Sequence, residues 1–187
     1  DFDRFIEYAF AINYSNRLFR EFKLHTNGVV FGEERARLLV RLANQPGQSA
    51  DTFGFVHFSI DAHSRAAYAD VKGADKQELV YRNIERFLKV RHEMGALRPF
   101  VTLAFVVQDG NAHEARAFRD HWLGRLQALG REVAQTWDWP DREVDTLYFR
   151  PLNTGDQGTA DRLHADVCRD LGLTDSREHR LRREESF

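Results

Sequence analysis

The chain has 187 residues, with 27 Lys and Arg against 29 Asp and Glu, and a formal net charge of −2. That length is sufficient for one domain with a substantial core, and the balanced charge gives no indication of a nucleic-acid partner. No run approaches the roughly 18 apolar residues of a membrane-spanning helix, and the first residues lack a signal-peptide pattern. We therefore expect a cytoplasmic protein without a membrane partner. The single cysteine, Cys168, excludes an internal disulfide framework and a cluster that needs several thiolates from this chain.

The elements follow from the spacing of apolar residues. Phe2, Ile6, Phe10 and Asn13 recur at three- and four-residue intervals and predict an opening amphipathic helix. Strands are expected at 19–25, 54–60, 100–108 and 144–150, and helices at about 32–44, 64–68, 76–94, 111–129 and 157–171. The residues from Thr174 onward are highly charged and poor in apolar side chains, so 174–187 is expected to be a disordered tail.

One helix followed by four strand–helix units predicts an α/β fold with a parallel sheet or partial (β/α) barrel. Ligands of such folds bind at the carboxyl ends of the strands. An opening helix without a strand of its own is unusual, because the repeating unit begins with its strand.

The strand predicted at 54–60 carries the strongest functional signal. His57, Ser59 and Asp61 alternate along it and its exit, so they project from one face, while the residues between them are apolar. A face with an imidazole, a hydroxyl and a carboxylate lines a site better than it fills a core. The other strands divide in the same way, with polar residues such as Thr102 and Arg150 on one face.

Three stretches of the sequence together resemble a known family. They are LHTNGVVF at 24–31, FVHFSIDAHSRAAYADVKGADKQELVYRNIERFLKVR at 55–91 and RPFVTLAFVVQDGNAHEARAF at 98–118. In this order they resemble the core of radical S-adenosylmethionine (radical SAM) enzymes, in particular those that modify peptides and proteins, over residues 1 to about 155.

The resemblance implies a partial barrel of six strand–helix units. The first unit of the family carries three cysteines, spaced by three and then two residues, that hold a four-iron, four-sulfur (4Fe-4S) cluster, and the second ends in a glycine-rich turn. This sequence matches from the helix after that turn, so we expect 1–173 to be a truncated core of an iron-sulfur oxidoreductase. Because the cluster cysteines are absent, we expect this form to be inert, although the parent protein would reductively cleave S-adenosylmethionine.

The resemblance also assigns roles to particular residues. It implies cofactor contacts for Asn27, Ser59, Asp61, Arg150 and, by location only, Arg82. It places His25, Thr102 and Gln108 toward a peptide or small-molecule substrate.

The same residues have simpler interpretations. Ser59 and Asp61 could cap the helix that starts near Ser64, and Asn27 with Gly28 could serve only the turn. Arg150 could pair with Asp156.

Several other side chains also have alternative explanations. Trp137 and Trp139 are more typical of packing, and Cys168 of a partly buried apolar position. His25, His57, His63 and His113 could gather a metal at the barrel mouth, as in metal-dependent hydrolases.

Two further hypotheses follow. The chain could be a cluster-free binding or interaction module that uses the polar cleft without redox chemistry. A sheet that begins at 19–25 would also expose an edge strand, which predicts self-association.

Overall fold

The computed structural model describes residues 1–46, 53–141 and 143–173. In chain order the elements are α1 (Phe2–Asn16), β1 (Phe22–Thr26), α2 (Glu33–Ala43), β2 (Phe53–Ser59), α3 (Arg65–Lys72), α4 (Gln77–Glu93), β3 (Phe100–Val107), the 3₁₀ helix η1 (Ala112–Glu114), α5 (Ala115–Ala128), β4 (Val133–Thr136), β5 (Asp145–Pro151) and α6 (Gln157–Leu171). The tail predicted at 174–187 lies outside the described residues. Within those residues, no helix has the length and apolar character needed to span a membrane.

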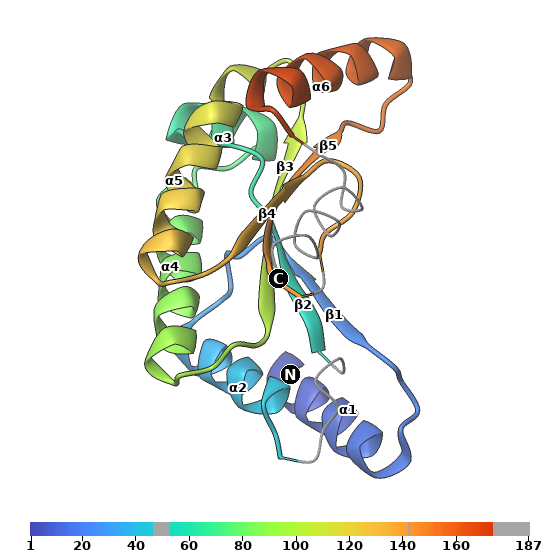
Figure 1. The fold of residues 1–187 in the computed structure, drawn as a ribbon, viewed down its shortest axis with the longest axis vertical. Coiled ribbons are helices and arrows are strands. Elements are labelled where there is room, and N and C mark those ends of the chain that lie inside the picture. Colours follow the sequence, from blue (N-terminus) through green and yellow to red (C-terminus); the bar gives the residue numbers. More distant parts are fainter. Residues whose placement is uncertain (47–52, 142, 174–187) are drawn as a thin grey trace, which may run out of the picture.

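All strands pair in parallel, in the order β1-β2-β3-β5-β4. The expected α/β class with a parallel sheet is therefore confirmed (Figure 1). The expectation of four strands is wrong, because β4 adds a fifth strand along the outer side of β5. Its four residues, VAQT, are too few to show a period of two, and only the partner strand defines them as a strand.

One face of the sheet forms the core. Val56, Leu103, Phe105, Leu147 and Phe149 are all completely buried there. The apolar stripes of α2, α4, α5 and α6 contribute to the same core. Each large side chain removed from water in this way contributes about 1.5–3 kcal/mol. The spacing that predicted the strands and helices thus also determines which face of the sheet is covered.

The opening helix packs where the strands begin (Figure 1). Phe10 of α1 is fully buried, and its ring stacks on Phe22 with centroids 4.4 Å apart and lies 5.5 Å from the Phe53 ring. Phe22 and Phe53 are the first residues of β1 and β2. Helix α1 therefore closes the amino-terminal end of the sheet. Strand β1 is an edge strand, as expected, and self-association through it stays a prediction.

A buried ion pair joins α4 to the sheet. Both guanidinium NH groups of Arg91 donate to the carboxylate of Asp145, at 2.8 and 2.7 Å, and both side chains are essentially inaccessible to solvent. Asp145 also accepts from the Val101 backbone N–H at 2.8 Å and from Arg131 Nε at 2.9 Å. The charges are thus paired and hydrogen-bonded, which burial of an ion pair requires.

Candidate functional site

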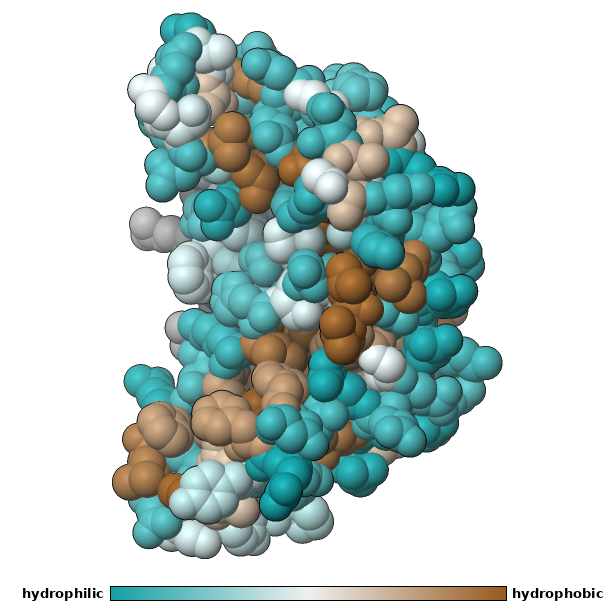
Figure 2. Space-filling view, turned by 180° about the vertical axis from the view of Figure 1, so that it is seen from behind, coloured by the Kyte–Doolittle hydropathy of each residue, from teal (hydrophilic) through white to brown (hydrophobic). Residues whose placement is uncertain are grey.

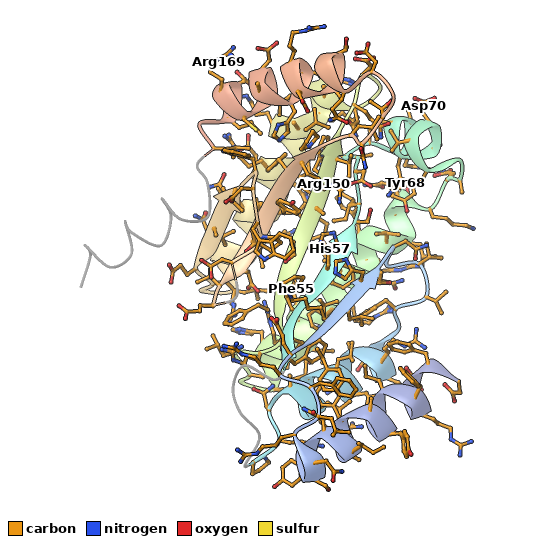
Figure 3. All side chains as sticks on the ribbon, turned by 90° about the vertical axis from the view of Figure 1, so that its right-hand side faces the viewer. Phe55, His57, Tyr68, Asp70, Arg150 and Arg169 are labelled. Carbon is orange, nitrogen blue, oxygen red and sulfur yellow. The ribbon has the colours of Figure 1, made fainter. Side chains whose placement is uncertain are left out.

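The face of the sheet opposite the core carries the polar side chains. Parallel pairing places His25, His57, Thr102 and Thr146 side by side in one row across four strands. Figure 3 looks onto this side, with Phe55, His57 and Arg150 labelled on it. Figure 2, which views the molecule from behind, shows a surface that is mostly hydrophilic, with the apolar residues in separate patches. The expected split of each strand into an apolar face and a polar face is what produces this row.

Aromatic rings surround His57 on this face. The His25 ring stacks on the His57 ring at 4.5 Å, and the Tyr148 ring meets it edge-on at 6.2 Å. His57 is 8% exposed. Burial, followed by the positive groups around it, lowers the pKa of His57 from 6.5 to about 4. At neutral pH the imidazole is therefore uncharged.

A three-residue polar cluster stands at the end of β2. Ser59 Oγ donates to Asp61 Oδ2 at 2.9 Å, and Lys72 Nζ donates to Ser59 Oγ at 3.0 Å. Lys72 also forms an ion pair with Asp61. The Lys72 side chain keeps 23% of its surface exposed, against 5% for Asp61. The ammonium and the serine hydroxyl are thus the parts of this cluster that a ligand could reach.

Asp61 also joins the ends of two strands. Its Oδ1 accepts from the Val106 backbone N–H at 2.8 Å, and its carbonyl accepts from Asn111 Nδ2 at 2.7 Å. Asp61 adopts a left-handed backbone conformation with φ of 62°, which is uncommon for a non-glycine residue and consistent with a functional turn. Asn111 is the first residue of the helix expected at about 111–129, but its side chain makes no cap hydrogen bond there and ties this turn to β3 instead.

The simpler interpretation of Ser59 and Asp61 is wrong, because Ser64 performs the capping. Ser64 Oγ accepts from the Ala67 backbone N–H at 3.2 Å at the start of α3. Ser59 and Asp61 instead contact Lys72, the last residue of that helix. The sequence analysis did not identify Lys72 as a site residue. Its signal was its position just before Gly73, in the segment that follows Ser59.

The remaining predicted site residues are dispersed. Asn27 is exposed, and its Oδ1 accepts from the Val29 backbone N–H at 3.1 Å, as in a turn. Arg82 is exposed on α4, in the helix layer of the opposite face. Gln108 lines a pocket beside α6 with Leu152 and other residues.

Arg150 is exposed on β5 opposite Val106. It lies on the polar face and contributes to lowering the pKa of His57. Asp156, its suggested structural partner, caps α6 by accepting from the Thr159 backbone N–H at 3.1 Å.

The β4–β5 connection folds back over the amino-terminal half of the polar face. Lys23 Nζ of β1 lies 5.4 Å from the centre of the Trp139 ring, although β1 and β4 are the opposite edges of the sheet. Tyr148 Oη donates to the Asp138 carbonyl at 3.2 Å. Trp139 is half exposed, so its role is only partly the expected packing. The connection therefore lies near Phe55, and Lys23 Nζ is 5.5 Å from the centre of the Phe55 ring.

The histidines proposed for a metal lie in two separate places. His25 and His57 stack on the polar face, whereas His63 contacts Tyr81 and His121 among the helices. In the described part of the chain, no three His, Cys, Asp or Glu side chains gather as a group that could hold a metal ion.

Cys168 does not provide a reactive thiolate. Its Sγ lies 3.3 Å from His164 Nε2, but that nitrogen also lies 3.2 Å from the Phe149 carbonyl. Burial raises the pKa of the Cys168 thiol to about 11. The thiol is therefore protonated at neutral pH and is a weak nucleophile.

Comparisons with protein-family models, with curated proteins and with solved structures give no match. The geometry of the polar face therefore carries the functional argument.

Proposed function

We propose that the polar face binds S-adenosylmethionine and a peptide or small-molecule substrate, as part of a radical SAM oxidoreductase. The observation that supports this most is the cluster of Lys72, Ser59 and Asp61 at the carboxyl end of β2, on the face that the helices leave open. Parallel α/β folds place their ligands at this end of the sheet. The sequence resemblance independently assigns Ser59 and Asp61 to the cofactor.

The side chains at this end suit the polar parts of S-adenosylmethionine. The partly exposed Lys72 ammonium could bind the methionine carboxylate, and the Ser59 oxygen could accept a hydrogen bond from a ribose hydroxyl. The contacts favour Lys72 over Arg82 for the carboxylate, because Lys72 touches Ser59 and Arg82 lies in the opposite layer. Arg150, exposed on the same face, remains available to a second anionic group.

The iron-sulfur cluster does not fit the residues of this chain. Such a cluster needs several thiolates, and the one cysteine has a raised pKa and lies on α6. The family chemistry is reductive cleavage of S-adenosylmethionine, and its cluster ligands would have to come from residues outside this sequence. What these 187 residues would contribute is cofactor and substrate binding, and we derive no redox step from them.

Calorimetric titration of the chain with S-adenosylmethionine tests this proposal. Ser59→Ala and Lys72→Met should each weaken binding about tenfold, since the first removes a hydrogen-bond acceptor and the second a cationic donor that would contact the ligand directly. Lys89→Met is the matched control, because Lys89 is an exposed lysine on α4 in a surface pair with Glu93. Absence of binding, or equal affinity in all variants, would contradict the proposal.

The cluster-free binding module remains the alternative. This alternative needs only the polar face itself, with the cluster of Lys72, Ser59 and Asp61 at its end. Under this alternative, peptides or nucleosides would bind as tightly as S-adenosylmethionine. The same titrations, repeated with S-adenosylhomocysteine, adenosine and methionine, distinguish the two functions.

A further inference from the structure

Two polar atoms on paired residues of the polar face are buried without a hydrogen-bond partner. They are His57 Nδ1 and Thr102 Oγ1. His57 is 8% exposed and Thr102 is completely buried, and the two residues are directly paired across β2 and β3. Leaving a buried donor or acceptor unsatisfied is unfavourable, so each such group needs an explanation. Two at adjacent positions indicate a place where a ligand completes the hydrogen bonding.

The charges around this pair favour an uncharged ligand group. The hydroxyl is neutral and the imidazole is neutral at pH 7. Lys72 and Arg150 place positive charge near His57, and Lys23 places it near His25, while the carboxylate of Asp61 is already paired with Lys72. A cationic group would be repelled here, and a carboxylate would be drawn to the more exposed cations.

The rings around the pair favour a planar group. Besides the stacked His25 and the edge-on Tyr148, Phe55 lies with its ring centre 6.4 Å from that of His57. A carboxamide is planar and uncharged, and it offers both a donor and an acceptor within the reach of two adjacent strands. Tyr148 is only partly buried and its ring meets His57 edge-on, so a substrate would reach the pair by displacing this ring.

We propose that His57 and Thr102 form a subsite for the carboxamide of a peptide substrate, reached past Tyr148. The proposal rests on the proposed function, which places substrate on this face, and it adds the chemical group that is recognised. His57 Nδ1 and Thr102 Oγ1 would each hydrogen-bond the amide, while the rings on either side exclude water from it.

The test is a titration followed by NMR of the labelled histidine rings, with N-acetylphenylalaninamide as the probe. The probe should shift the His57 resonances, and 3-phenylpropanoate, which bears a carboxylate and no amide, should shift them less. His57→Phe and Thr102→Val should each weaken amide binding about tenfold. Thr102→Ser should retain the affinity, as should the control Thr159→Val at an exposed position of α6.

Urea unfolding of the same variants tests whether the substitutions weaken binding only by destabilising the fold. Because Thr102 Oγ1 has no partner in the free protein, Thr102→Val should leave the unfolding midpoint unchanged or higher. No His57 shift with the amide, or equal amide affinity in wild type and Thr102→Val, would overturn the inference.

A parallel titration with S-adenosylmethionine separates the two proposals. If the cofactor binds but both substitutions leave the affinity for the amide unchanged, this inference alone fails. If the amide binds through His57 but the cofactor does not bind, the proposed function fails and the subsite stands.

Discussion

Acidification should destabilise the fold through His57. The pKa of this imidazole is lowered from 6.5 to about 4, chiefly by burial. Between these two pH values the unfolded chain binds a proton at His57 that the folded chain does not bind. Stability therefore falls as the pH drops from 6.5 toward 4, and this contribution does not change further below about pH 4. The difference of about 2.5 between the unfolded and folded pKa values of His57 corresponds to about 3 kcal/mol in the free energy of unfolding.

Urea unfolding of wild type and His57→Phe at several pH values between 4 and 7 measures this contribution. His25, His121 and His164 also have lowered pKa values, so the wild-type curve contains more than one group. The difference between the two proteins isolates His57, and the variant should lose about 3 kcal/mol less on acidification. Parallel pH profiles, or an NMR titration of folded His57 centred near 6.5, would refute the reasoning.

Two further predictions concern groups outside the open face. Asp145→Asn should lower the free energy of unfolding by about 3–5 kcal/mol, because it leaves the buried Arg91 guanidinium without its counter-charge. The exposed control Asp166→Asn should stay within about 0.5 kcal/mol, and equal urea midpoints for the two variants would contradict this. Cys168, with its raised pKa, should react slowly with iodoacetamide at pH 8 when folded and readily in urea. Mass spectrometry follows the labelling, and fast modification of the folded protein would be inconsistent with the buried thiol.

The positions of most elements were predictable because their periodicity spans many residues. Helix α4, for example, was expected at 76–94 and is found at Gln77–Glu93, with its apolar stripe on the core. Strand β1 was expected from residue 19 but begins at Phe22. Arg17 ends α1 in a left-handed conformation, and the Phe19 backbone N–H donates a hydrogen bond to the Asn13 side chain, so these residues do not extend the strand. Strand β4 was not predicted, since four residues do not establish a period.

The candidate site was predicted in part. Alternation along β2 placed His57 and Ser59 on one face, and the register with β1 and β3 brought His25 and Thr102 beside His57. The functional assignments themselves stay predictions. Asn27, Arg82 and Gln108 lie apart from the Ser59 cluster, because their contacts depend on turns and helix placement that local patterns do not specify.

The sequence by itself determined the α/β class, the alternation of strands and helices, and which side chains share each face, because these depend on periods of 2 and 3.6 along the chain. Only the tertiary structure placed Lys72 against Ser59, brought Lys23 over the Trp139 ring from the opposite edge of the sheet, and left His57 Nδ1 and Thr102 Oγ1 without hydrogen-bond partners. These contacts join residues on different elements. Their geometry is set by how the elements pack and how the strands register, which no local pattern of residues encodes.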